Sequence, residues 1–322
     1  MASSYNNTTI KQMTYNGQKV KKWYHDGVKV FSAGNVVTYH VNTDTSYQEE
    51  IDSEASCLSP TTFTPELSGY TFVGWREDTT ASGEVLSEKA MGDESIDLYA
   101  VFSKSYTFST TIGTKYATSY YNNGNTRNPV IYIWNSSASE EIVATGASCL
   151  SPTSFTPSMT GATFLGWTDN SASATAISSK VMGSEPIVLY AVWKYADTSI
   201  AISSASYEHG GHMSYGGDHT FIYGIDPTKY SHITITISAR LSQDYQSSYY
   251  YVRFYVVACG KHYYLMSGGD DGDAETYGGR PTYELGTSEN TFRAYTYQEH
   301  DSTGYGRMSV SDAVLTGRTV VK

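Results

Sequence analysis

An internal repeat constrains the fold of this chain more than any other feature. Residues 55–65 read ASCLSPTTFTP, and residues 147–157 read ASCLSPTSFTP. The match continues through residues 69–75 with 161–167, and through residues 96–102 with 187–193. A match this long does not arise by chance, so the chain carries two copies of one structural module.

Each copy has the residue pattern of β-strands. The segments Thr-Phe-aliphatic-Gly-Trp and Leu-Tyr-Ala-Val-aromatic alternate with a period of two, which is typical of strands. Each copy also opens with a β-rich run, at residues 36–41 and 130–134. The repeat-matched aromatic residues are therefore predicted to pack in the cores: Trp75, Trp167, Tyr99 and Tyr190.

The two signatures, GYTFVGW with LYAVF and GATFLGW with LYAVW, resemble the Listeria–Bacteroides repeat, also called the internalin B-repeat. The resemblance covers about residues 36–104 and 128–195. It implies a small β-grasp-like module found in bacterial surface proteins and phage structural proteins. Ala162 replaces the usual Tyr, and Phe102 replaces the usual Trp; both departures leave the implied fold unchanged.

The first 35 residues predict a small β-meander. Asn16-Gly17 and Asp26-Gly27 separate β-prone runs, and such pairs favour tight hairpin turns because both turn residues need positive φ. A meander of this size is marginal alone, so it favours attachment to a partner surface. The segment is also rich in lysine, which suits an acidic partner. Its lysines are Lys11, Lys19, Lys21, Lys22 and Lys29.

We therefore expect an all-β chain of four parts. These are an attachment meander (1–35), a first repeat (36–104), an inserted hairpin or linker with the second repeat (105–195), and a Tyr-rich β-sandwich or jelly roll (196–322). In the last part, Ile233, Ile235 and Ile237 alternate with polar residues, which predicts a strand with one buried face.

The net charge of −11 argues against nucleic acid and membrane-surface partners, because both require concentrated Lys and Arg. No run of about 18 apolar residues predicts a membrane span. The start of the sequence lacks the basic and apolar regions of a signal peptide, so we expect synthesis in the host cytoplasm. Cys57, Cys149 and Cys259 are odd in number and are expected to be buried free thiols.

Tyr251, Arg253 and Tyr255 form the candidate ligand site. They share one face of a predicted strand, and aromatic faces stack on sugar C–H surfaces while Arg and hydroxyl groups form hydrogen bonds. A second buried sheet face and a homo-oligomer interface remain alternatives, since aromatic residues mark interfaces as readily.

Two clusters carry metal-ligand chemistry. His209 and His212 lie in a Gly-rich stretch and could bind zinc, whereas Asp270, Asp271 and Asp273 could bind calcium. Neither spacing matches an established motif, so exposed loop histidines and a solvated acidic turn are the preferred interpretations. The sequence otherwise predicts no cofactor.

The sequence contains no nucleophile elbow, phosphate-binding loop or HExxH motif, which favours a non-enzyme. The leading hypothesis is a bacteriophage virion protein, as a tail fibre, baseplate-associated or capsid-decorating component. Its N-terminal segment would bind other virion proteins, and its last part would bind host-surface glycan or protein. A bacterial adhesin and a polysaccharide depolymerase are the alternatives. A homotrimer would have to form through β domains, since the sequence has no coiled-coil heptads.

Overall fold

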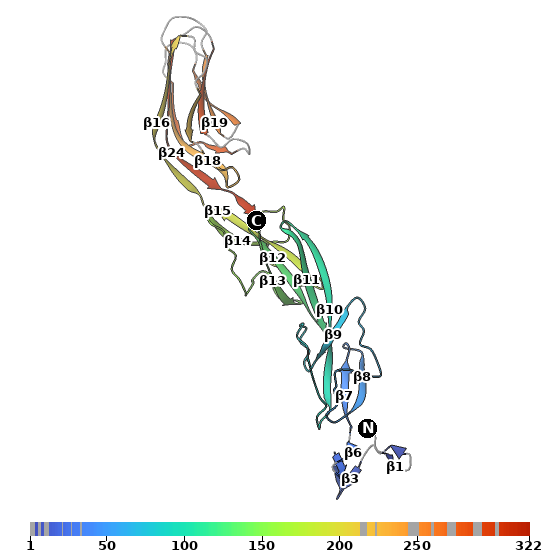
Figure 1. The fold of residues 1–322 in the computed structure, drawn as a ribbon. Coiled ribbons are helices and arrows are strands. Elements are labelled where there is room, and N and C mark those ends of the chain that lie inside the picture. The colour runs from blue at the N-terminus through green and yellow to red at the C-terminus, as the bar shows by residue number, and fades with distance from the viewer. Residues whose placement is uncertain are drawn as a thin grey trace. The chain divides into compact units, whose positions relative to one another are not determined.

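The computed structural model describes residues 4–5, 8–9, 13–20, 22–26, 28–32, 34–212, 218–222, 224–243, 251–258, 261–268, 275–285, 292–299 and 303–322. All the regular secondary structure in these residues is β-strand, so the all-β prediction is confirmed (Figure 1). In this described part, no helix is long and apolar enough to cross a membrane.

The chain divides into two compact units. Unit 1 comprises residues 1–156, 167–171 and 176–191, and unit 2 comprises residues 157–166, 172–175 and 192–322. Strands β14 (Ala162–Thr168) and β15 (Ile187–Tyr195) contribute residues to both units. The domain limits drawn from the sequence stay a prediction.

The N-terminal segment forms short hairpins at the two expected turns. Asn16 and Gly17 have φ of 50° and 74°, and Asp26 has φ of 51°, as tight two-residue turns require. Each hairpin pairs only within itself among the described residues, so three separate hairpins, two of them at the expected turns, replace the expected meander. The strands are β1 (Ser4–Tyr5), β2 (Thr8–Thr9), β3 (Met13–Tyr15), β4 (Gln18–Val20), β5 (Lys22–His25) and β6 (Val28–Ser32).

The first repeat is a small mixed sheet in unit 1. Its strands are β7 (Gly34–His40), β8 (Ser46–Asp52), β9 (Thr71–Arg76) and the first part of β10 (Ile96–Thr110). β7 and β8 form an antiparallel hairpin, β10 pairs parallel with β7, and β9 pairs antiparallel with β10. The parallel pair is possible because a long crossover separates β7 from β10.

The second repeat reproduces this pairing. β12 (Asn125–Trp134) and β13 (Ser137–Ala144) form the antiparallel hairpin, and β15 pairs parallel with β12. Val130 faces Ile187 in the second register as Val37 faces Ile96 in the first. The sequence repeat is therefore a repeat of strand register.

The two repeats contain the same aromatic core. In the first, the ring centroids of Tyr39 and Trp75 lie 4.9 Å apart, and Phe63 lies 5.3 Å from Tyr39. In the second, Tyr132 and Trp167 lie 4.9 Å apart, with the ring of Phe155 5.2 Å from Tyr132. Edge-to-face and tilted pairs at these distances are favourable beyond the area they bury.

Residues 105–127 complete the sheet of unit 1. β10 continues to Thr110 and turns into β11 (Gly113–Asn122), and the two pair antiparallel along their whole shared length. The last residues of β11 then pair with the start of β12, so this hairpin joins the two repeats (Figure 1). It is a hairpin and not an unstructured linker.

Unit 2 contains a β-sandwich. One sheet has the order β16–β24–β18–β21 with β22 beside β18, and the other has the order β17–β23–β19–β20. The strands are β16 (Thr198–His212), β17 (Asp218–Ile222), β18 (Tyr230–Gln243), β19 (Tyr251–Ala258), β20 (Lys261–Gly268), β21 (Glu275–Gly279), β22 (Thr282–Glu284), β23 (Phe292–Glu299) and β24 (Thr303–Gly317).

Both sheets of the sandwich contribute to one core. Ile233, Ile235 and Ile237 of β18 are fully buried, as their alternation predicted, and pack in the same cluster as Ile222 of β17 and Val256 of β19. A shared apolar core between two sheets is the defining feature of a sandwich.

The end of the described chain pairs with β15. β25 (Thr319–Val321) is antiparallel to residues 192–194, and the indole N–H of Trp193 donates to the carbonyl oxygen of Lys322 at 3.1 Å. Just before β25, a Cβ on Gly317 would lie 1.8 Å from the carbonyl oxygen of Tyr195. Only glycine fits at this close approach of two backbones.

Candidate functional site

The predicted ligand residues Tyr251, Arg253 and Tyr255 lie on β19. Their backbones pair with Glu299, Tyr297 and Tyr295 of β23. Their side chains lie outside the described part of the chain, so the predicted platform stays a prediction.

The predicted metal ligands divide into two cases. The backbones of His209 and His212 lie in β16, opposite Gly306 and Thr303, so the Gly-rich stretch is strand and not the expected loop. Their side chains, like the whole of Asp270, Asp271 and Asp273, lie outside the described residues. Within the residues that the structure does describe, no three His, Cys, Asp or Glu side chains gather as a metal site.

The repeat-matched cysteines are structural. Cys57 and Cys149 are free thiols with no exposed surface, which confirms the prediction for these two. Burial raises the pKa of both thiols, so neither is an activated nucleophile. Cys259 lies outside the described residues.

The repeat-matched aromatics separate into two faces. Trp75 and Trp167 are core residues, 1% and 2% exposed, as predicted. Tyr99 was also expected in the core, but it is only partly buried and stacks on His40, with ring centroids 4.6 Å apart. Tyr190 is also only partly buried, but it packs against the buried cluster of Ala117, Ile131 and Ile133, in line with its predicted role in packing. The tyrosines buried beside these tryptophans are Tyr39 and Tyr132, on the opposite face of the sheet.

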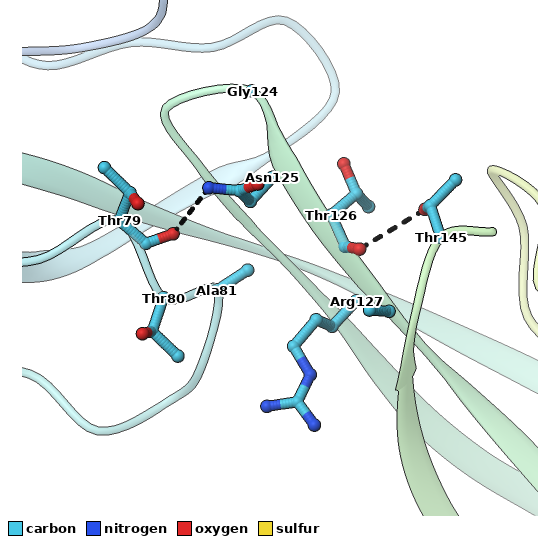
Figure 2. Close-up of a pocket in the computed structure, with 9 residues that line it drawn as sticks. Thr79, Thr80, Ala81, Gly124, Asn125, Thr126, Arg127 and Thr145 are labelled. Carbon is cyan, nitrogen blue, oxygen red and sulfur yellow. Dashed lines mark hydrogen bonds between the residues drawn. The ribbon is translucent and has the colours of Figure 1, made fainter. Parts of the chain in front are cut away.

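A polar cleft of about 520 Å³ lies in unit 1 where the loop after β9 meets the turn between β11 and β12 (Figure 2). The loop is held by asparagine side chains. Asn122 Nδ2 donates to the carbonyl oxygens of Asp78 and Thr80 at 3.0 and 3.1 Å, and Asn125 Nδ2 donates to that of Thr79 at 2.9 Å.

The turn that closes this cleft requires glycine. Gly124 has φ of +87°, and a Cβ there would lie 2.8 Å from Cγ2 of Thr43. Strong charge pairing fixes the opposite wall, since Arg76 donates to both carboxylate oxygens of Asp78 at 2.9 Å. The guanidinium of Arg76 holds the pKa of Asp78 well below its usual range.

Two side chains of this cleft donate hydrogen bonds to backbone carbonyl oxygens. Arg127 Nη2 donates to the carbonyl oxygen of Ile142 at 2.9 Å, and Thr145 Oγ1 donates to that of Thr126 at 3.2 Å. Neither residue stands beside a nucleophile and a base. The cleft is therefore best understood as the joint between the two repeats.

A second cleft in unit 1, of about 430 Å³, lies between the β10–β11 hairpin and β13. It combines three aromatic rings, hydroxyl groups and one carboxylate. Its lining includes Tyr106, Tyr116, Thr118, Tyr120 and Glu140. Sequence reasoning missed this site because residues 105–127 were left open between a hairpin and a linker. The available signal was the alternation of Tyr116, Thr118 and Tyr120.

A comparison with known protein families finds one family model that matches the sequence. The model of the Listeria-Bacteroides repeat domain matches residues 36–101 and 116–192. These ranges contain the two registers described above, and they confirm the resemblance seen in the sequence. No curated protein matches the sequence.

Among solved structures, the chain is similar to "Structure of infectious bursal disease virus Gx strain", with 6% identity and a TM-score of 0.20. The match covers 70% of this chain and 56% of that chain, which is less than two thirds of its length. "Structure of infectious bursal disease virus Gt strain" gives 8% identity, a TM-score of 0.21 and coverage of 69% and 78%. At TM-scores this low, the similarity indicates neither a shared fold nor a shared function.

Proposed function

The chain contains two copies of the Listeria–Bacteroides repeat domain, and we propose that it is a non-enzymatic surface protein that holds a recognition domain. The supporting observation is that the repeats and the β-sandwich have separate apolar cores. Two repeats share one aromatic core design, and a β-sandwich of different topology follows them. Separate β modules suit display and binding, because loops and faces can vary while the cores stay intact.

The specific form of the proposal is a bacteriophage virion protein, as a tail fibre, baseplate-associated or capsid-decorating component. In this form the short N-terminal hairpins attach to other virion proteins, since two-stranded hairpins of three to five residues need a partner surface to be stable. Trp23 of β5 is 47% exposed and supplies an apolar ring for such a contact.

The sandwich of unit 2 is proposed to recognise the host envelope. Strand β19 brings Tyr251, Arg253 and Tyr255 into register with the Tyr-containing strand β23. Tyrosine and arginine are enriched where proteins bind other molecules. Host-surface glycan is the proposed ligand class, and neither a metal nor another cofactor is needed for it.

Electron microscopy tests the proposal. Particles and cells from the source culture are labelled with an antibody whose epitope lies within residues 196–322. Label that projects from phage particles supports the virion role. Label on the bacterial wall, with none on particles, rejects it and supports a bacterial adhesin, the second function that the repeat family suits.

A different measurement distinguishes a depolymerase from a protein that only binds the polysaccharide. The full chain is incubated with host-wall polysaccharide, and the mass of the polymer is followed by size-exclusion chromatography. Binding with unchanged polymer mass supports the non-enzymatic proposal, whereas a fall in polymer mass rejects it.

A further inference from the structure

We propose that the cleft between the β10–β11 hairpin and β13 is a saccharide-binding site in unit 1. This site is separate from the sandwich and does not rest on the proposed role of unit 2. Its ligand class is a short neutral oligosaccharide, bound by tyrosine rings and by hydroxyl and carboxylate groups of the cleft.

The strand register places five of the lining residues on one face of the hairpin. Thr107 lies opposite Tyr116, and Ser105 lies opposite Thr118, while Tyr120 is the next residue of the same alternation on β11. Directly opposed residues share a face of an antiparallel pair. All five residues line the cleft.

The aromatic rings suit the apolar faces of sugars. Tyr116 is 75% exposed, so its large aromatic ring is open to solvent. Tyr120 lines the same cleft and is only partly buried. Tyr106 lines the cleft from the face of Ala117, and Lys104 Nζ lies 4.9 Å from the centroid of its ring. A tyrosine ring offers an apolar face for C–H groups and a hydroxyl for a hydrogen bond.

The polar groups select against other ligands. Glu140 places a carboxylate in the cleft, where it can accept hydrogen bonds from sugar hydroxyls. No lysine or arginine lines the cleft, so a phosphate backbone is disfavoured. The hydroxyls of Ser105, Thr107 and Thr118 make the surface too polar for a purely apolar ligand.

The site is held in place before any ligand arrives. Ala117 packs the hairpin against Ile131 and Ile133 of β12, in a buried cluster. The ring of Tyr120 rests against Gly83, where a Cβ would lie only 2.7 Å from the tyrosine hydroxyl oxygen. Groups fixed in this way lose little conformational entropy on binding.

Saturation-transfer NMR tests the site with the full chain. The probes are maltotriose, cellotriose, mannotriose and triacetylchitotriose, each mixed with wild type, Tyr116→Ala, Glu140→Gln and Tyr15→Ala. Tyr15 is 73% exposed and outside the cleft, so it is the matched control for loss of an exposed tyrosine. Circular dichroism verifies that each variant is folded.

The expected result is binding of at least one probe, weakened roughly tenfold by Tyr116→Ala and reduced by Glu140→Gln, with Tyr15→Ala unchanged. Binding of no probe overturns the proposal, as does equal binding by wild type and Tyr116→Ala. Probe binding that is unchanged in Tyr116→Ala places the probe outside this cleft, so it overturns the present proposal and leaves the proposed recognition by unit 2 standing.

Discussion

Glu49 and Glu141 show how one residue can close a loop in both repeats. The carboxylate of Glu49 accepts hydrogen bonds from the backbone N–H groups of Thr61 and Thr62, at 2.8 and 2.6 Å, and from the hydroxyl of Thr62 at 2.6 Å. Glu141 accepts the matching bonds from Thr153 and Ser154. A carboxylate can satisfy several donors at once, which a neutral side chain does less well.

The ionised form of Glu49 is the stabilising one. Burial of its side chain tends to raise the pKa, but the hydrogen bonds from Thr62 and Thr61 outweigh it and lower the pKa from 4.5. A lowered folded-state pKa means that the stabilisation is present above the unfolded value and is lost as the pH falls through the folded value.

Glu49→Gln is therefore expected to destabilise unit 1 by about 1–3 kcal/mol at about pH 7, because charge-assisted bonds to backbone donors are lost. The difference from wild type should shrink as the pH falls through the lowered pKa of Glu49, because protonation removes the charge of the wild-type carboxylate. Urea unfolding followed by tryptophan fluorescence measures both free energies of unfolding.

Glu50→Gln is the matched control for this change. Glu50 is the exposed neighbour of Glu49, so its substitution should alter the free energy of unfolding by about 0.5 kcal/mol or less. An equal effect of the two substitutions, or a Glu49→Gln deficit that persists undiminished at low pH, would contradict the role assigned to Glu49.

At the scale of elements, the repeats differ on the face opposite their aromatic cores. Ile131 and Ile133 of β12 are buried, whereas the residues at the same register in β7, Thr38 and His40, are only partly buried and more polar. The β10–β11 hairpin covers the isoleucine face through Ala117 and Phe108. The first repeat has polar residues on the matching face. The same module can therefore have this face either covered by a hairpin or partly exposed to solvent.

Ile131→Ala should destabilise unit 1 by about 2–5 kcal/mol, because the buried side chain leaves a cavity under the hairpin. The register-matched substitution Thr38→Ala in the first repeat should cost about 0.5 kcal/mol or less. Chemical denaturation of both variants provides the comparison. Similar losses at the two positions would show that the hairpin does not cover the second repeat as described.

At the scale of the whole molecule, stability is expected to come from separate apolar cores and not from covalent cross-links. The cores include the cluster around Tyr39 and Trp75 and the sandwich cluster around Ile235. Cys57 and Cys149 lie in equivalent places with free, buried thiols. A disulfide would stabilise mainly by restricting the unfolded chain, and these two residues supply none.

Reducing agent should consequently leave the calorimetric melting curve unchanged. Iodoacetamide should label Cys57 and Cys149 only after unfolding, since both are fully buried and burial raises the pKa of each thiol. Peptide mass spectrometry before and after denaturation measures the labelling. A marked fall in Tm with reductant, or rapid labelling of the native protein, would oppose this view.

The sequence by itself determined the repeated module, the all-β class, the turns at Asn16-Gly17 and Asp26, and the burial of Trp75 and Trp167. These features depend on local information, because turn geometry, strand period and the recurrence of a motif are all contained in short segments. The alternation of Ile233, Ile235 and Ile237 was informative for the same reason.

Only the tertiary structure decided which tyrosine of each repeat is buried, where residues 105–127 run, and that β25 returns to β15. Each depends on pairing between residues far apart in the chain, and a period of two defines two faces without saying which one becomes the core. The cleft beside β13 depends on the same kind of pairing. The alternation of Tyr116, Thr118 and Tyr120 marks one face of the hairpin, but Glu140 joins the lining only when the hairpin packs against the second repeat.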